Sequence, residues 1–202
     1  NLPFKILNTA TLDDSQLAEN PHLLGFTGFT LAVNDQEAKQ LAKSQLLVVA
    51  LNAQGNLLDA TRVQIPRLLD YLYTRNNNDA NEAHLGLHYQ GEQVTTSVWA
   101  PTASQVKIHL YNAGKQAIAV HGMTLNADTG IWSYTGNKAE LDRLFYRYEL
   151  NVYHPLTGKI EALTSTDPYS VGLSSNGEYT QFVDLSDDDL KPTGWDDHPV
   201  PT

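Results

Sequence analysis

Residues 106–111 read Val-Lys-Ile-His-Leu-Tyr, a run in which every second side chain is aliphatic. Residues 145–150, Phe-Tyr-Arg-Tyr-Glu-Leu, alternate in the same way and put Tyr146, Tyr148 and Leu150 on one side. Successive side chains of a β-strand point to opposite faces of the sheet, so both runs predict strands with one buried face. The periodicity of this part of the chain is therefore that of a β-sheet.

Five more segments have the composition or the alternation of strands. They are residues 94–98, 117–120, 131–135, 159–163 and 179–185. Turns rich in Gly, Asn, Asp and Pro separate them at intervals of roughly 8–12 residues, which is the spacing of a β-sandwich. We therefore predict a mainly β chain with an immunoglobulin-like β-sandwich over residues ~85–185.

The composition of the chain changes near residue 84. Residues 1–84 hold five aromatic side chains and residues 85–202 hold the other thirteen, with a polar run at 76–82 just before the change. A shift of this kind indicates a domain boundary. We predict an accessory domain over residues 1–84, a sandwich over 85–186 and a linker over 187–202.

The first domain mixes helical and strand-like patterns. Its expected elements are a helix over 11–19, a strand over 26–33, a helix from Asn34 or Asp35 through Lys43, a hairpin of 46–51 with 57–63, and a helix over 65–75. The helices are supported by capping residues and by a Pro at a helix start, and the hairpin is supported by a turn between two apolar runs. They predict a small helix-decorated β or α+β domain.

The bulk composition excludes several classes of partner. The chain has 202 residues, 41% of them hydrophobic, and a net charge of −10. That charge would repel a phosphate backbone or an anionic lipid surface, so we expect neither nucleic acid nor membrane contact. No cysteine is present, which excludes disulfides, thiol catalysis and thiolate metal sites.

No catalytic motif is evident, and we predict neither catalytic nor metal-ligating residues. The sequence lacks a G-x-S-x-G elbow, a Walker loop and an H-E-x-x-H pair. His84 and His88 are four residues apart at a strand entry, where their side chains need not converge on a metal. The acidic residues Asp184 and 187–189 could hold Ca²⁺, but we interpret their charges as solvated because the run lacks the spacing of a calcium loop.

The three tryptophans divide into two groups. Trp99 and Trp132 lie within alternating strands, so we predict that both fill the core. Trp195 lies in an irregular segment beyond the last strand, and an exposed Trp there is expected to pack against another surface. We therefore assign Trp195 as an interdomain contact.

Six ordered landmarks carry a resemblance to a known family. They are residues 97–103 (Ser-Val-Trp-Ala-Pro-Thr-Ala), 106–111, 130–132 (Gly-Ile-Trp), 146–148 (Tyr-Arg-Tyr), 155–159 (Pro-Leu-Thr-Gly-Lys) and 167–170 (Asp-Pro-Tyr-Ser). Together they resemble carbohydrate-binding module family 48, the β-sandwich that precedes the catalytic barrel in debranching and branching enzymes of the α-amylase superfamily, glycoside hydrolase family 13. Residues 154–161 and 166–170 look most like the pullulanase and limit-dextrinase branch.

The first half is similar, less specifically, to the N2 domain that precedes this module in those enzymes. The similarity rests on residues 25–29, Gly-Phe-Thr-Gly-Phe, and 58–65, Leu-Asp-Ala-Thr-Arg-Val-Gln-Ile. Family members usually carry more chain upstream of this start. The resemblance therefore implies an N2-like domain that is truncated at its beginning.

The resemblance implies a non-catalytic role. The chain would be an N-terminal accessory fragment of a pullulanase-type α-1,6-debranching enzyme that braces the catalytic barrel in cis and binds α-glucan weakly or not at all. The alternative is an autonomous starch- or glycogen-binding module with measurable affinity. No cofactor is expected, Ca²⁺ being considered only for the complete enzyme, and the expected location is secreted, periplasmic or at the surface of a bacterium.

Carbohydrate-binding residues are hard to assign by this resemblance. Glycogen-binding members of the family are expected to present two exposed Trp side chains, and the matching stretches here, 111–114 and 154–158, contain none. Tyr111 is the only aromatic residue near the expected place. Tyr111 is therefore the candidate sugar-binding residue.

Overall fold

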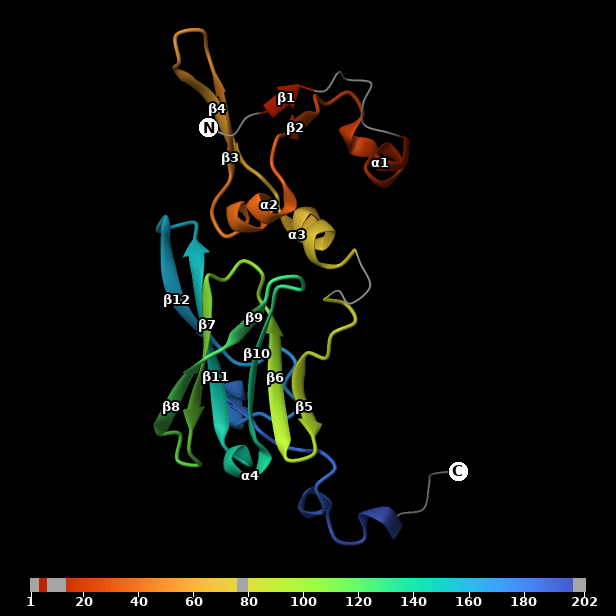
Figure 1. Ribbon diagram of the computed structural model, residues 1–202, viewed down its shortest axis with the longest axis vertical. Coiled ribbons are helices and arrows are strands. Elements are labelled where there is room, and N and C mark those ends of the chain that lie inside the picture. The colour runs from red at the N-terminus through yellow and green to blue at the C-terminus, as the bar shows by residue number, and fades with distance from the viewer. Residues whose placement is uncertain (1–3, 7–13, 76–79, 198–202) are drawn as a thin grey trace. The chain divides into compact units, whose positions relative to one another are not determined.

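The computed structural model describes residues 4–6, 14–75 and 80–197 (Figure 1). The chain divides into two compact units, Asn1–Gln40 and Leu41–Thr202. This division differs from the limit near residue 84, because residues 41–75 contact the sandwich through pairs such as Tyr153 and Gln45. The limits 1–84, 85–186 and 187–202 stay predictions.

The first unit is small and mostly exposed. Its described elements are β1 (Phe4–Ile6), α1 (Asp14–Glu19), the 3-10 turn η1 (Pro21–Leu23), β2 (Phe29–Leu31) and the start of α2 (Asp35–Leu41). Strand β1 pairs antiparallel with β2, which is shorter than the predicted strand 26–33. The predicted helix start at Thr11 lies outside the described residues.

Helix α2 begins where the sequence predicts. The amide of Glu37 donates to Asn34 Oδ1 at 2.9 Å, and the amide of Asn34 donates to Glu37 Oε2 at 2.9 Å. These reciprocal hydrogen bonds form a capping box, which satisfies two amides that a helix start leaves unpaired. Local residues therefore set this helix boundary.

The predicted hairpin and the helix after it are present in the second unit. Strand β3 (Leu47–Leu51) pairs with β4 (Leu57–Arg62), and α3 (Pro66–Tyr73) follows. Every residue of β3 and β4 is exposed. The hairpin therefore stands as a two-stranded ribbon, a form that has little stability alone.

Helix α3 joins the hairpin to the sandwich. Tyr73 is buried, and its ring lies against Gly130 in the turn before β10 (Ile131–Asn137). Gly130 has φ +71°, and a Cβ there would approach Pro101 to 2.8 Å and the Tyr73 ring to 3.1 Å. Only glycine fits this close approach.

Two antiparallel sheets form the predicted immunoglobulin-like sandwich (Figure 1). One has the order β5-β6-β10-β9, and the other has the order β12-β11-β7-β8 with β13 beside β11. The remaining bounds are β5 (Gly86–Gln90), β6 (Gln93–Trp99), β7 (Gln105–Tyr111), β8 (Ala117–Gly122), β9 (Thr124–Asn126), α4 (Lys138–Leu141), β11 (Phe145–His154), β12 (Lys159–Ser165), η2 (Ser175–Gly177) and β13 (Thr180–Gln181). Sequence periodicity missed β5, β9 and α4, and predicted β13 as a longer strand.

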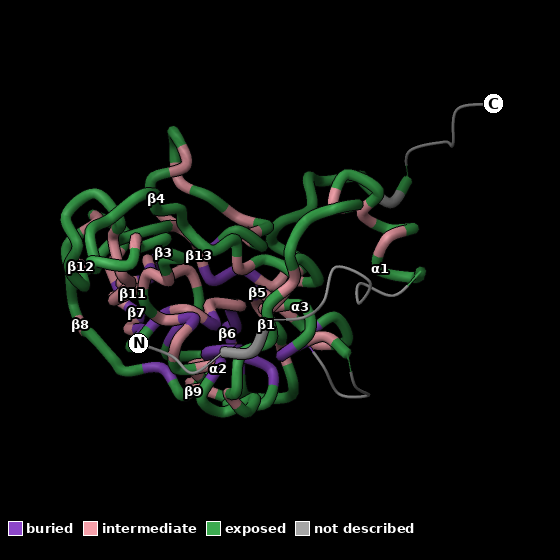
Figure 2. The backbone as a smooth tube through the Cα atoms, turned by 90° about the horizontal axis from the view of Figure 1, so that it is seen from above, coloured by how far each residue is buried: buried purple, intermediate pink, exposed green. Residues whose placement is uncertain are grey.

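The core lies between the two sheets, where the buried segments gather (Figure 2). Tyr146 and Tyr148 are fully buried and Trp132 is only 7% exposed, as the alternation predicts. The prediction that Trp99 fills the core is wrong. Trp99 is half-buried and lies outside the core cluster, and its indole N–H donates to Thr129 O at 3.0 Å. Its neighbour Val98 occupies the core face instead.

Candidate carbohydrate-binding and interdomain surfaces

Tyr111, the candidate sugar-binding residue, lies at the end of β7 and is half-buried. Its ring meets Tyr179 edge to face, with ring centroids 4.9 Å apart and an interplanar angle of 72°. Burial raises the pKa of Tyr111, so its hydroxyl stays protonated at neutral pH. The ring is therefore held by a neighbour within the chain.

Two cations cover the aromatic rings beside Tyr111. Lys115 Nζ lies 2.8 Å from the centroid of Phe145 and 5.9 Å from that of Tyr179. Arg147 Cζ lies 5.7 Å from the Tyr179 centroid. These are cation–π contacts, so the flat faces that could stack on a sugar are partly occupied by side chains of the protein itself.

Residues 111–114 and 154–158, the two stretches that match the expected sugar-binding positions of the family, lie far apart on the sheet. Tyr111 is opposite Phe145 at one end of β11, whereas His154 is opposite Lys159 at the other end. Nine residues of strand separate Phe145 from His154, which corresponds to roughly 30 Å. Residues 111–114 and 154–158 therefore do not form one binding surface in this chain.

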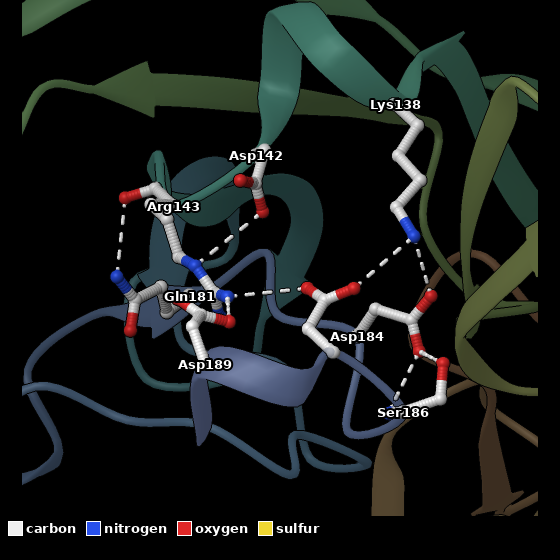
Figure 3. A network of polar contacts seen from close by, with 8 residues as sticks. Lys138, Asp142, Arg143, Gln181, Asp184, Ser186 and Asp189 are labelled. Carbon is white, nitrogen blue, oxygen red and sulfur yellow. Dashed lines mark hydrogen bonds and ion pairs between the residues drawn. The ribbon is translucent and has the colours of Figure 1, made fainter. Parts of the chain in front are cut away.

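The acidic residues after β13 are ion-paired with the sandwich (Figure 3). Lys138 Nζ lies 2.7 Å from Asp184 Oδ2 and 3.4 Å from Asp187 Oδ1. Arg143 Nη2 lies 3.1 Å from Asp187 and 2.7 Å from Asp189. The interpretation of these charges as solvated is therefore wrong for Asp184 and Asp187, whereas the side chain of Asp189 is 71% exposed beside its ion pair.

We call this set of Lys138, Arg143, Asp184, Asp187 and Asp189 the tail clamp. Both cations come from the segment that carries α4, and all three carboxylates come from the start of the tail. Among the described residues, no group of three or more His, Cys, Asp or Glu side chains is arranged to hold a metal ion. The clamp therefore neutralises the acidic run with protein cations.

The tail clamp predicts an acid-dependent loss of stability. The Lys138 ammonium beside Asp184 lowers the pKa of that carboxyl to about 2, against about 3.9 in an unfolded chain. A lowered folded-state pKa stabilises the protein above pH ~4, and this contribution is lost as the pH falls toward ~2. Asp184→Asn should therefore be less stable than the wild type at pH 7 and equal to it near pH 2.

Urea unfolding from pH 2 to pH 7 measures this difference. The exposed Asp188 provides the matched control, and Asp188→Asn should follow the wild type throughout. A pH-independent difference for Asp184→Asn would contradict the assigned role of the ion pair.

Within the clamp and beyond it, the tail exposes large apolar side chains. Trp195 begins the 3-10 turn η4 (Trp195–Asp197) and is 60% exposed. Leu185 and Leu190 are also exposed, the latter at the end of η3 (Asp188–Leu190). The assignment of Trp195 as an interdomain contact stays a prediction, and residues 198–202 of the predicted linker lie outside the described part.

Fluorescence quenching should distinguish the tryptophans. In single-Trp variants we expect acrylamide to quench Trp195 strongly and Trp132 weakly, because the indole ring must be reachable by the quencher. The half-buried Trp99 should fall between them. A Trp195 as protected as Trp132 would show that the tail packs onto the sandwich.

Asp167 is a buried carboxylate that the sequence analysis did not identify as part of a site. Asp167 is 2% exposed and accepts hydrogen bonds from the hydroxyls of Tyr146 at 2.7 Å and Tyr148 at 3.1 Å. Its other oxygen accepts from the amide of Tyr169 at 2.8 Å, and its own amide donates to Thr180 Oγ1 at 2.9 Å. Burial raises the pKa of both tyrosines, so their hydroxyls remain donors.

The His84 and His88 rings lie against each other. They stack with centroids 5.0 Å apart and an interplanar angle of 13°. Both residues are exposed. A two-histidine stack supplies fewer ligands than the four of a structural zinc site.

Comparison with known families matches the two halves separately. Residues 5–71 match the pullulanase N2 domain, and residues 84–170 match carbohydrate-binding module 48, the isoamylase N-terminal domain. No helix among the described residues is long and apolar enough to cross a membrane.

Curated relatives extend the match over nearly the whole chain. The chain is 50% identical to a pullulanase of Klebsiella aerogenes over 202 residues, and 39% identical to a pullulanase of Klebsiella pneumoniae over 196 residues. Each alignment covers 96% of this chain and 17% of the relative. A chloroplastic pullulanase 1 of Arabidopsis thaliana is 36% identical, covering 87% of this chain and 17% of that protein. The chain thus spans about a sixth of the curated relatives it matches.

Solved structures agree with this match. A Klebsiella pneumoniae pullulanase complexed with maltotriose aligns with a TM-score of 0.84 at 36% identity, over 97% of this chain and 18% of that one. A Paenibacillus barengoltzii pullulanase in complex with maltohexaose and α-cyclodextrin aligns with a TM-score of 0.51 at 27% identity, over 66% of this chain and 19% of that one.

Proposed function

The chain belongs to the N-terminal region of the pullulanases, since it combines a pullulanase N2 domain with a family 48 module, and we propose that it is the non-catalytic accessory part of an α-1,6-glucan debranching enzyme. In this role it braces the catalytic barrel in cis and assists the binding of branched α-glucan. The accessory role requires no cofactor, and we propose an exported bacterial protein as its source.

The observation that carries the bracing role is the exposed apolar tail. The tail clamp holds the chain where it leaves the sandwich, and Leu185, Leu190 and Trp195 are exposed along the segment that follows β13. Apolar side chains gathered on a soluble domain mark a surface for interaction. The rest of the same polypeptide is the partner we propose, because this chain spans only 17% of its relatives.

The accessory role predicts catalytic silence. Retaining and inverting glycosidases need two carboxyl groups on either side of the scissile bond. The clustered carboxylates described above are paired with Lys138 and Arg143 or buried in the core as Asp167. The purified chain incubated with pullulan should release no more reducing sugar than a heat-denatured sample, and turnover would refute the proposal.

The alternative is an autonomous glucan-binding module. Isothermal titration of the chain with maltoheptaose or β-cyclodextrin separates the two roles. A Kd in the micromolar range would favour the autonomous binder, whereas a Kd near or above ~1 mM supports the accessory role, because ~1 mM corresponds to only about 4 kcal/mol.

A further inference from the structure

A cluster of cations and aromatic rings lies on the sandwich where β7 ends and β11 begins. Its members are Tyr111, Lys115, Arg147 and Tyr179, and we call it the Arg147 cluster. The neighbours of Arg147 on β11, Tyr146 and Tyr148, are buried in the core, so strand alternation places Arg147 on the outer face of the sheet. All four members are half-buried, and solvent therefore reaches the cluster.

The two cations of the cluster have no carboxylate partner among residues 4–6, 14–75 and 80–197. The Arg147 side chain donates no hydrogen bond to any described residue, and its Nε–H is buried without an acceptor. A buried donor without a partner lowers stability. Lys115 Nζ donates one long hydrogen bond, 3.4 Å to Ala113 O. The hydrogen-bonding capacity of both cations is therefore largely unused by the described chain.

The turn between β7 and β8 holds Lys115 in place. The Lys115 amide donates to Asn112 O at 2.9 Å, and the Gln116 amide donates to Asn112 Oδ1 at 3.1 Å. Lys115 has φ +63°, a left-handed conformation that is uncommon outside glycine and is found most often at functional sites. The turn thus places the ammonium beside the rings at the cost of a strained backbone.

The carboxylate nearest in charge to the cluster is already paired. Burial is the main cause of the raised pKa of Tyr111, and the charges of Arg147 and Glu149 act on that pKa in opposite directions, so both groups lie near the Tyr111 hydroxyl. Glu149 accepts a hydrogen bond from Lys107 Nζ at 2.8 Å and lies 2.9 Å from His109 Nε2. The charge of Glu149 is therefore offset by its own partners and does not compensate Arg147.

We propose that the Arg147 cluster binds a phosphate group. The Arg147 guanidinium can hold two phosphate oxygens, Lys115 supplies a second positive charge, and the Tyr111 hydroxyl supplies a neutral donor. Two positive charges match the charge of about −1.5 to −2 that a phosphate ester carries at pH 7. A carboxylate carries one negative charge and leaves one of the two cations unbalanced.

The overall charge of the chain does not prevent this binding. A net charge of −10 repels a phosphate polymer over most of the surface. A single phosphate responds mainly to charges within one Debye length, about 8 Å at physiological ionic strength, and here those include two unpaired cations. The inference goes beyond the accessory role, which does not require an anion site.

Titration of inorganic phosphate into the ¹⁵N-labelled chain at pH 7 and constant ionic strength, followed by amide chemical shifts, tests the proposal. The largest shifts are expected at residues 111–116, 146–148 and 179–180. The expected Kd is in the millimolar range, because ionic contacts open to solvent are weakened by water and salt. Sodium chloride provides the reference titration and should leave these amides unchanged.

A second titration identifies the source of the phosphate group. Glucose 6-phosphate with the same Kd as inorganic phosphate would assign the site to the phosphate group alone, and a lower Kd would assign it to a phosphate ester. Glucose without the phosphate should shift none of the cluster amides.

Three variants test the residues. Arg147→Gln should raise the phosphate Kd at least about fivefold, because it removes the charged two-point contact. Lys115→Gln, in the turn, should raise it about two- to threefold, because it removes a single charge. Lys159→Gln is the matched control, since Lys159 is exposed at the other end of β11, opposite His154, and this variant should bind as the wild type does.

Several results would overturn the proposal. They are the absence of phosphate-induced shifts at the cluster, equal affinity for the wild type and a folded Arg147→Gln, and equal losses in Arg147→Gln and Lys159→Gln, which would show attraction by diffuse charge. Shifts of the cluster amides with glucose alone would also overturn it. None of these results bears on the accessory role, which the pullulan assay tests separately.

Discussion

Trp132→Ala should lower the free energy of unfolding by about 3–5 kcal/mol, the usual cost of truncating a buried aromatic side chain. Trp132 belongs to the core cluster between the sheets, and its indole N–H donates to Ala100 O at 3.1 Å. The substitution therefore leaves a cavity and also removes the donor for a backbone carbonyl. Urea unfolding followed by circular dichroism measures the loss.

Trp195→Ala is the matched control for this experiment. Because Trp195 is exposed and outside the core cluster, its truncation should change stability by no more than ~0.5 kcal/mol. A Trp132→Ala variant as stable as Trp195→Ala would show that Trp132 does not fill the core. In that case its ring would have to be reconsidered as part of a binding surface.

Asp167→Ala should also be strongly destabilising, by about 3–5 kcal/mol. Both tyrosine hydroxyls that donate to this carboxylate come from β11 and are buried, so the variant leaves them without their acceptor. The amide of Tyr169 loses its acceptor as well. Unfolding in urea at pH 7 again measures the effect.

Two further variants separate the hydrogen bonds from the packing. Asp167→Asn keeps an acceptor oxygen and should be less destabilised than Asp167→Ala. In a Tyr146→Phe background one of the hydroxyls that would lose its acceptor is already absent. Asp167→Ala should therefore lower the free energy of unfolding by less there than in the wild type. Equal costs in the two backgrounds would show that the Tyr146 hydrogen bond to Asp167 contributes nothing to stability.

The sequence alone determined the elements whose signals are local. The alternation at residues 106–111 and 145–150 predicted β7 and β11 with the correct buried faces, because strand period and burial are coupled residue by residue. Asn34 or Asp35 as a cap predicted the start of α2, and the structure adds the capping box of Asn34 with Glu37, which needs only four residues. The family landmarks added the pairing of an N2 domain with a family 48 module.

The tertiary structure decided which side chains those elements bring together. Asp184 and Lys138 are 46 residues apart, and nothing near Asp184 in the sequence indicates that its charge is paired. Asp167 appeared only as part of a family landmark, because its partners Tyr146 and Tyr148 come from another strand. Trp99 was assigned to the core although it follows Val98 of the core face, so its ring points to the other side of β6, where its indole N–H donates to Thr129 O.

The hydrogen bond between Tyr153 and Gln45 shows the same limit most clearly. The two residues are 108 positions apart in the sequence, and the bond forms only because the hairpin base and the sandwich meet. Periodicity states which face of a strand is buried, but it does not state which surface lies opposite. Local interactions therefore determined the strands and helices of this protein, and only the packing between distant segments determined the polar contacts between them and the candidate binding surfaces.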